Sequence, residues 1–206
     1  MRVKICGITN FDDANICAEY GADSVGFIFY RKSKRYISPE KAEEIIKKLP
    51  AFIKKIGVFV NEDIDLINKI GAQIKLNIVQ LHGDEGQQYI DKCIFPVIKS
   101  FRVTEKFDYN ILNTYKNCNY LLDSYDNVDY GGTGKNFDWN KIPDEIRNKI
   151  ILAGGISQSN IATIFHSISP AAVDVSSSLE IEPGKKDHNK LIEFLKTVNK
   201  LRYIQC

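Results

Sequence analysis

Short apolar runs alternate with amphipathic stretches along the whole chain. The apolar runs are three to five residues long and rich in valine, isoleucine and leucine, which is typical of buried strands. They cover residues 3–6, 25–29, 56–60, 78–81, 96–100, 120–123, 150–153 and 173–175. Between them, apolar residues recur at helical spacing over residues 12–20, 39–49, 64–74, 85–92, 161–168 and 189–201. This pattern predicts a chain of alternating strands and helices.

Start signals support several of these helices. Ser38 precedes Pro39, which places an N-cap before a proline at the first helical position. Ser157 or Ser159 is expected to cap the next-to-last helix. The segment 103–117 is the weakest helix prediction, because asparagines and aromatic residues interrupt its pattern.

Strict alternation of strand and helix predicts a parallel sheet covered by helices. Eight strands in a chain of 206 residues match the lower size limit of a closed (βα)8 TIM barrel. We therefore predict an α/β protein with one catalytic barrel domain over residues 1–206, since no linker or inserted domain is recognisable. A doubly wound open sheet is the alternative.

Composition narrows the class of protein. The formal net charge is +2, so no large basic field favours nucleic acid as a partner. The longest apolar run, residues 25–30, is too short to span a membrane, and no signal peptide precedes the first strand. Five scattered cysteines and three histidines show neither a disulfide framework nor the spacing of a metal site. We expect a soluble protein of a reducing cytoplasm, without a bound metal.

Two strands near the C-terminus end in small residues. Gly154 and Gly155 follow one apolar run, and Ser176 and Ser177 follow the next, which contains Asp174. If the two strands are neighbours, both turns open at the carboxyl end of the sheet, where backbone N–H groups can bind a phosphate. These five residues form the candidate phosphate site.

Two other strand ends carry groups that can transfer protons. Cys6 ends the first strand, and Lys4 lies two residues earlier on the same face, where its charge would favour the thiolate. Asp123 ends the sixth strand and would face the first strand across the barrel mouth. A thiol and a carboxyl group on opposing sides of one pocket can serve as general base and general acid. Taken singly, a core cysteine and a turn-capping aspartate are the ordinary alternatives.

Three loops at the same rim carry further candidates. The run 31–35 is basic, and the guanidinium of Arg35 could hold a substrate carboxylate through two hydrogen bonds. His82 ends the fourth strand, where it could equally cap a turn. The segment 131–135 lacks the spacing of a P-loop and is expected to be a mobile, glycine-rich loop over bound substrate.

Longer motifs contain these candidates and occur together in one known family. They are Lys-Ile-Cys-Gly-Ile-Thr at residues 4–9, Gly-Phe-Ile-Phe at 26–29 with Ser33 and Arg35, Gly-Val-Phe-Val-Asn at 57–61, Val-Gln-Leu-His-Gly at 79–83, Leu-Asp-Ser at 122–124, Gly-Gly-Thr-Gly-Lys at 131–135 with Phe-Asp-Trp at 137–139, and the segments 152–156 and 173–187. In this order they resemble phosphoribosylanthranilate isomerase over nearly the whole chain.

The resemblance implies a ribulose-phosphate-binding (βα)8 barrel of tryptophan biosynthesis. Its substrate would be N-(5-phosphoribosyl)anthranilate, converted to 1-(2-carboxyphenylamino)-1-deoxyribulose 5-phosphate by an Amadori rearrangement without metal or organic cofactor. On matching positions, Cys6 would be the general base, Asp123 the general acid and Arg35 the ligand of the anthranilate carboxylate. Lys4 and His82 would complete the substrate site, next to the phosphate site named above.

The implied roles require shifted acidities, and the chain departs from the family pattern at two places, Ser178 and the loop 30–35, which lacks the prolines often found there and should be more flexible and more basic. Asp123 must be protonated near neutral pH, well above its ordinary pKa of about 3.9. Cys6 must be deprotonated, and the charge of Lys4 is expected to lower the pKa of the Cys6 thiol. Ser178 stands where the family often has glycine, so a positive φ there would strain the serine.

Other interpretations remain open at the level of sequence. A histidine-pathway isomerase would carry a carboxylate where this chain has Cys6, and a Schiff-base aldolase would use Lys4 or Lys99. A non-catalytic phosphosugar-binding barrel would not need Cys6 to face Asp123. A monomer is favoured over a homodimer, because no long exposed apolar patch is recognisable.

Overall fold

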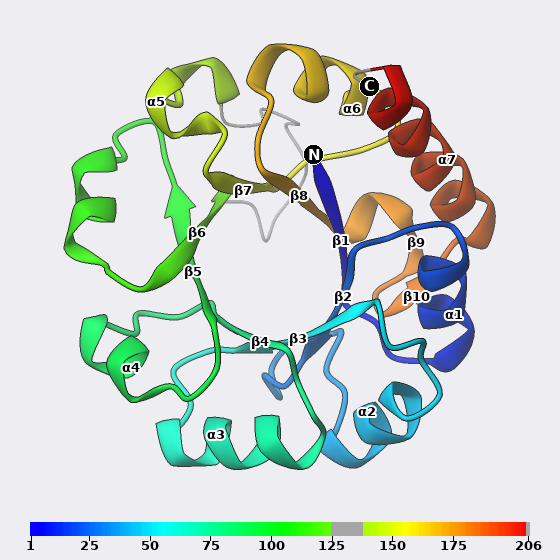
Figure 1. Ribbon diagram of the computed structural model, residues 1–206, viewed down its shortest axis with the longest axis vertical. Coiled ribbons are helices and arrows are strands. Elements are labelled where there is room, and N and C mark those ends of the chain that lie inside the picture. The colour runs from blue at the N-terminus through cyan, green and yellow to red at the C-terminus, as the bar shows by residue number, and fades with distance from the viewer. Residues whose placement is uncertain (125–137, 205–206) are drawn as a thin grey trace.

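Eight parallel strands form a closed barrel in the computed structural model, which describes residues 1–124 and 138–204 (Figure 1). The strands follow one another around the barrel, and β8 pairs with β1 to close it. They are β1 (Arg2–Cys6), β2 (Ser24–Ile28), β3 (Lys54–Phe59), β4 (Ile78–Leu81), β5 (Val97–Val103), β6 (Cys118–Ser124), β7 (Ile150–Ala153) and β8 (Ala172–Val175). Every predicted strand is present, with ends that differ by up to three residues, and the open-sheet alternative is excluded.

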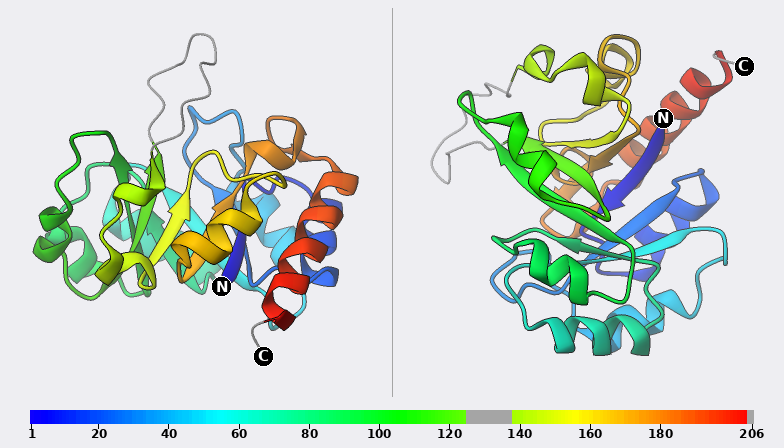
Figure 2. Two further views of the ribbon diagram at one scale, coloured as in Figure 1. Left: turned by 90° about the horizontal axis from the view of Figure 1, so that it is seen from above. Right: turned by 60° about the vertical axis from the view of Figure 1, so that its left-hand side comes forward.

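Helices surround the barrel (Figures 1 and 2). The α-helices are α1 (Phe11–Glu19), α2 (Pro39–Ile46), α3 (Ile64–Gln73), α4 (Gln87–Lys92), α5 (Asp144–Arg147), α6 (Ile161–Thr163) and α7 (His188–Ile204). Shorter helical turns are η1 (Tyr109–Thr114), η2 (Trp139–Lys141), η3 (Ile164–Ile168) and η4 (Ser177–Leu179). Near the end of α7, Arg202 donates to the carbonyl oxygen of Met1 at 2.9 Å, which holds this helix against the start of β1.

Of the two helix caps predicted from the sequence, one differs from the structure and one is confirmed. The N-cap position of α6 is Asn160, without a side-chain hydrogen bond, so the prediction that Ser157 or Ser159 caps this helix is wrong. The two serine hydroxyls lie 2.9 Å apart and bond each other instead. The cap at Ser38 is confirmed, because its hydroxyl accepts from the backbone N–H of Lys41 at 3.4 Å.

The weak helix predicted between β5 and β6 is reduced to the 3₁₀ turn η1. Asp108 precedes it, and its carboxylate accepts from the N–H of Asn110 at 2.9 Å. Such local side-chain bonds compete with the α-helical ladder, which accounts for the interrupted pattern.

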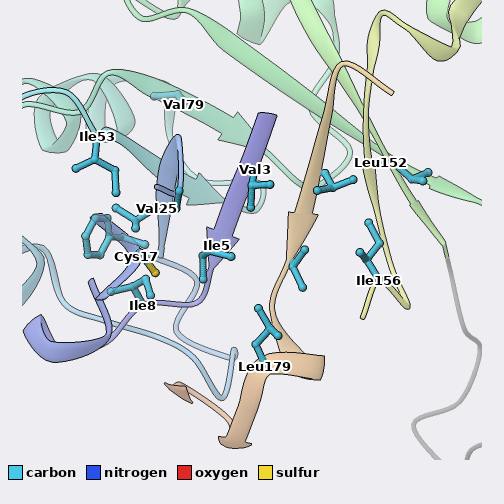
Figure 3. Close-up of a cluster of buried hydrophobic side chains, with 14 of the residues drawn as sticks. Val3, Ile5, Ile8, Cys17, Val25, Ile53, Val79, Leu152, Ile156 and Leu179 are labelled. Atoms are coloured by element: carbon cyan, nitrogen blue, oxygen red, sulfur yellow. The ribbon is translucent and has the colours of Figure 1, made fainter. Parts of the chain in front are cut away.

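Side chains of each strand alternate between the helices outside and the barrel interior. On β1, Val3 and Ile5 are buried in the large cluster between strands and helices that Figure 3 shows. Burying each such side chain stabilises the fold by about 1.5–3 kcal/mol. Lys4 and Cys6 therefore point inward. A separate small cluster with the same inward parity lies inside the barrel: Ile56, Ile98, Leu121 and Ala153.

A small antiparallel hairpin follows β8 at the carboxyl end of the barrel. It consists of β9 (Glu180–Glu182) and β10 (Lys185–Lys186), and its turn residue Gly184 has a φ of +86°, which glycine adopts readily. Ser178, just before the hairpin, does not have a positive φ, so the condition under which the serine would be strained is not met. Its hydroxyl donates to the carbonyl oxygen of Ile156 at 2.5 Å and thereby joins the loops after β7 and β8.

Two predictions from the sequence remain, one about the glycine-rich loop and one about membrane-spanning segments. The glycine-rich loop predicted at 131–135 lies outside the described residues. Within residues 1–124 and 138–204, no helix is long and apolar enough to cross a membrane.

Candidate active site

A pocket of about 400 Å³ opens at the carboxyl ends of the barrel strands. Each of the eight strands contributes one inward-facing residue, in chain order Cys6, Ile28, Val58, Gln80, Arg102, Asp123, Ala153 and Asp174. Loops after the strands add, among others, Tyr30, Arg35, His82, Gly154, Gly155, Ser176 and Ser177. The structure therefore brings together every site residue predicted from the sequence except Lys4, which lies buried beside Cys6.

Lys4, Cys6 and Asp174 form a compact group at the floor of the pocket. The register of β1 and β8 pairs Lys4 with Asp174, and the Lys4 Nζ lies 2.7 Å from Oδ2 of that aspartate. The same Nζ lies 3.1 Å from the Cys6 Sγ. Gly26 on β2 leaves room for the group, because a Cβ there would meet Sγ at 2.8 Å and the Lys4 Cε at 3.0 Å.

The predicted lowering of the Cys6 pKa is wrong for this site. Burial raises the pKa of the Cys6 thiol; the charge of Lys4 opposes this effect but is outweighed, and the charge of Asp174 raises the pKa further. Burial favours the neutral amine of Lys4, yet the charges of Asp174 and Cys6 raise the Lys4 pKa above its ordinary value. Without substrate, Cys6 is therefore a thiol at neutral pH and Lys4 a cation.

Asp123 has the shift that the sequence predicted. Burial and the charge of Asp174 raise the pKa of Asp123 to about 6, against opposing effects of Lys4 and Arg102. The Asp123 Oδ2 lies 3.5 Å from the Nε2 of His82. Burial lowers the pKa of His82 to about 4, with smaller effects of nearby cations, so the ring is neutral near pH 7 and this contact is not an ion pair.

Gln80 orients the His82 ring. Its amide nitrogen lies 3.0 Å from the Nδ1 of His82 and donates to the Ser100 hydroxyl at 3.1 Å. With the amide nitrogen as donor, Nδ1 is the acceptor and the proton of the neutral ring resides on Nε2. The Nε2–H group of His82 lies on the side of the ring that faces the Asp123 carboxyl group.

Arg35 lies in the loop after β2, on the rim of the pocket. Its guanidinium is bound to Glu180 by two short hydrogen bonds, from Nε to Oε1 at 2.8 Å and from Nη2 to Oε2 at 2.6 Å. The arginine side chain is still 25% exposed, so it reaches the pocket while one edge is held.

The candidate phosphate site forms another part of the rim. β7 and β8 pair directly, so the loops that begin at Gly154 and Ser176 lie side by side as predicted. Gly154 and Gly155 have φ values of +81° and +63°, which favour glycine and let the backbone turn under the pocket. The Ser176 hydroxyl donates to the carbonyl oxygen of Cys6 at 3.0 Å, which ties this loop to β1.

Comparison with known proteins decides the family. Residues 3–197 match the family model of N-(5'phosphoribosyl)anthranilate (PRA) isomerase. The chain belongs to the PRA isomerase family. It is thus an enzyme built on the TIM barrel typical of its solved relatives.

Individual PRA isomerases resemble it over nearly their full length. The isomerase of Thermotoga neapolitana is 46% identical over 201 residues, which are 95% of this chain and 97% of that protein. A crystal structure of a PRA isomerase in complex with reduced 1-(o-carboxyphenylamino)-1-deoxyribulose 5-phosphate has a TM-score of 0.86 and 41% identity, covering 97% of this chain and 99% of that one. A structure of mutually generated monomers of the dimeric Thermotoga maritima isomerase has a TM-score of 0.84 and 39% identity, covering 97% and 98%.

A buried ion pair near the candidate site was not predicted from the sequence. Glu85, expected to begin a helix, precedes α4, and its buried carboxylate accepts from the backbone N–H groups of Asn61 at 2.7 Å and Gly83 at 2.9 Å. Lys99 binds the same carboxylate at 2.8 Å and faces away from the pocket. Charged residues carry no hydropathy signal of burial, so the sequence pattern could not reveal this pair.

The alternative chemistries have little support in this geometry. Lys4 and Lys99 are both bound to carboxylates, so neither amine is free to attack a carbonyl group as a Schiff-base mechanism requires. Among residues 1–124 and 138–204, no three histidine, cysteine or acidic side chains lie close enough together to hold a metal ion.

Proposed function

We propose that this chain converts N-(5-phosphoribosyl)anthranilate to 1-(2-carboxyphenylamino)-1-deoxyribulose 5-phosphate, with Cys6 as general base and Asp123 as general acid. The observation that carries the assignment is that these two groups line one pocket from strands separated by β7 and β8. A volume of about 400 Å³ suits a ligand made of an aromatic ring, a pentose and a phosphate.

The two charged ends of the substrate fix its direction in the pocket. The phosphate binds to the loops of Gly154, Gly155, Ser176 and Ser177, where backbone N–H groups provide the hydrogen bonds. The anthranilate carboxylate binds to the exposed edge of Arg35. This arrangement lays the ribose over the floor formed by Cys6 and its neighbours. Asp174 contributes indirectly to this floor, because it holds Lys4.

The first step is a proton transfer from Asp123 to the ring oxygen of the ribose. The furanose opens to an iminium ion that is conjugated with the anthranilate nitrogen. With a pKa of about 6, roughly a tenth of Asp123 is protonated at pH 7 in the free enzyme. The phosphate and carboxylate of the bound substrate add negative charge and raise that fraction. His82, beside the carboxyl group, binds substrate near the acid.

The second step is removal of the proton on C2′ by Cys6. The electron pair of the broken C–H bond moves into the iminium group and gives an enolamine. The enolamine tautomerises to the ketone as C1′ gains a proton and the C2′ hydroxyl group loses one. The free thiol is a poor base because its pKa is raised. The iminium charge formed in the first step, together with the ammonium of Lys4 at 3.1 Å, favours the thiolate at the moment when it is needed.

The pH dependence of kcat/KM is expected to be bell-shaped with a broad flat top. Activity requires protonated Asp123 and deprotonated Cys6, but the pKa of the acid, about 6, lies below the raised pKa of the base. The active form is therefore a minority at every pH. Activity should rise up to about pH 6, stay level, and fall once the pH exceeds the pKa of Cys6.

Lys4→Met tests the origin of the alkaline limb. The Lys4 charge is the main effect that lowers the Cys6 pKa, so the limb should move to higher pH in this variant. Lys55→Met is the matched control. Lys55 is also a buried lysine, but it lies on β3 outside the pocket, and its ammonium group donates to the carbonyl oxygen of Pro50. An alkaline limb that stays in place in Lys4→Met would remove Lys4 from this role.

The function itself is tested by the fluorescence decay of phosphoribosylanthranilate, generated in situ, after addition of purified protein. Rapid decay to the ketose product is expected. Turnover of the histidine-pathway intermediate in place of this substrate would favour the related isomerase. Tight binding of phosphosugars without turnover of either compound would leave only a binding barrel.

A single-chain assembly remains our prediction. The most exposed large apolar side chains among the described residues are scattered over α7, β9 and the loops before β3 and β5: Tyr203, Ile181, Phe52 and Ile94. They form no contiguous patch along one element. Because a Thermotoga maritima relative is described as dimeric, light scattering of the purified chain is the direct check.

A further inference from the structure

Three charged side chains pack together under the rim of the pocket: Arg35, Glu180 and Lys186. The hairpin of β9 and β10 creates the group, because its register places Lys186 opposite Glu180. The Glu180 side chain is only 4% exposed and that of Lys186 is fully buried. Burying charges is costly unless they are paired, so the structure maintains this group at some expense of stability.

Glu180 grips one edge of the Arg35 guanidinium. Its Oε1 accepts from Nε at 2.8 Å, and its Oε2 accepts from Nη2 at 2.6 Å. A guanidinium has two edges that can each bind a carboxylate, one formed by Nε and Nη2 and the other by Nη1 and Nη2. With the first edge taken by Glu180, the second is the one available to a carboxylate in the pocket.

Lys186 holds Glu180 from the other side. Its Nζ donates to the Glu180 Oε1 at 3.0 Å and to the carbonyl oxygen of Cys6 at 2.6 Å. It also lies 3.3 Å from the carbonyl oxygen of Ser176. Burial alone would raise the pKa of Glu180, but the hydrogen bonds of Arg35 and the charge of Lys186 lower it below its ordinary value. Glu180 is thus an ionised carboxylate fixed to the β1 and β8 loop ends.

We propose that Glu180 is a positioning residue for substrate selection: it fixes the plane of Arg35 so that the Nη1–Nη2 edge receives the carboxylate of the anthranilate ring. Lys186 keeps Glu180 in place and sets its distance from the end of β1. The proposal rests on the proposed function, because Arg35 is the carboxylate ligand there. It adds that the preference for a carboxylated aromatic amine depends on a residue that does not touch substrate.

The side chain of Arg35 is also closely packed, which restricts its conformation. A Cβ added at Gly7 would lie 2.7 Å from the Arg35 Cδ, so the arginine crosses directly over the backbone after β1. Gly7 has a φ of +77°, where a side chain would be strained as well. The arginine is therefore confined by a glycine on one side and by a bidentate carboxylate on the other.

The test compares two ligands on the purified enzyme by calorimetry. One is the reduced product analogue with its ring carboxylate, and the other is the same compound with an unsubstituted phenyl ring. Glu180→Gln should weaken binding of the first by about tenfold, as expected for one well-oriented charge-assisted hydrogen bond, and leave the second unchanged. In the enzyme assay KM should rise by a similar factor, with kcat within about twofold.

A double-mutant cycle shows whether Glu180 acts through Arg35. Arg35→Met should weaken the carboxylated ligand strongly, and adding Glu180→Gln to it should change that affinity by less than about twofold. Asp23→Asn is the matched control, since it also removes a carboxylate from an arginine pair, with Arg202, but at the opposite end of the barrel. It should leave both affinities unchanged.

Each outcome decides between the ideas. If Glu180→Gln weakens binding of both ligands equally, or weakens binding of neither, the positioning role is overturned. It is also overturned if the effects of Glu180→Gln and Arg35→Met on the affinity for the carboxylated ligand are fully additive. If Glu180→Gln alone does not fold, the comparison uses Glu180→Gln with Lys186→Met, which removes both buried charges. Failure of the unmodified enzyme to bind the carboxylated analogue would instead overturn the proposed function.

Discussion

Asp123→Asn should lower kcat by about a hundred- to ten-thousand-fold, the usual worth of a positioned general acid. The amide has nearly the shape of the carboxyl group and keeps the pocket intact, but it cannot release a proton to the ring oxygen of the ribose. The raised pKa of Asp123, about 6, is what allows the natural residue to do so near neutral pH. Affinity for phosphate ligands should change by less than about twofold, because the loops that bind phosphate follow other strands.

Steady-state kinetics with in situ generated substrate measure this effect. Asp12→Asn is a suitable control, since Asp12 is an exposed aspartate on α1 and the change of residue type is identical. A large increase in KM with kcat preserved would place Asp123 in substrate binding rather than in proton transfer.

Cys6→Ala should have an effect of similar size, because it removes the only proposed acceptor of the C2′ proton. Cys6→Ser should be almost as inactive, since a hydroxyl group holds its proton far more strongly than a thiol. Both variants keep the backbone carbonyl of Cys6, to which Ser176 and Lys186 donate, so the phosphate loop should remain in place.

Single-turnover assays and binding of the reduced product analogue distinguish a loss of proton transfer from a loss of substrate binding. The analogue should bind Cys6→Ala about as well as the natural enzyme, whereas turnover is lost. Cys93→Ala provides the control, because this partly exposed cysteine lies at the end of α4, away from the pocket. Turnover by Cys6→Ala at more than a few per cent of the natural rate would contradict the assignment of the base.

Periodicity was sufficient to predict the barrel, because eight strands that alternate with helices leave few alternatives. The site residues followed from the same pattern, since strand ends converge at one rim. Where the prediction of the site's acidities failed, interactions between residues distant in sequence were responsible. Lys4 lies beside Cys6 as expected, but its charge is shared with Asp174, which comes from the other end of the chain. Neither the competition for Lys4 nor the degree of burial is visible in local sequence.

The ion pair between Glu180 and Arg35 was not predicted from the sequence for a related reason. The two residues are far apart in sequence and meet only because β8 closes the barrel on β1 and the hairpin after β8 folds back over the β1 end. The helix predicted over residues 85–92 is present as α4 but begins later, at Gln87, because Glu85 binds backbone N–H groups with its buried carboxylate, which the sequence pattern does not reveal.

The alternation along β1 has a consequence for how the enzyme can evolve. Val3 and Ile5 contribute to folding stability, whereas Lys4 and Cys6 contribute to chemistry, and the two sets share no side-chain surface. Substitutions of Cys6 can therefore change the reaction without altering the packing between strands and helices, whereas loss of Lys4 would leave the buried carboxylate of Asp174 unpaired. A deletion of one residue in this strand would exchange the two sets and abolish both properties together, so new activities should arise here by replacement and not by changes of length.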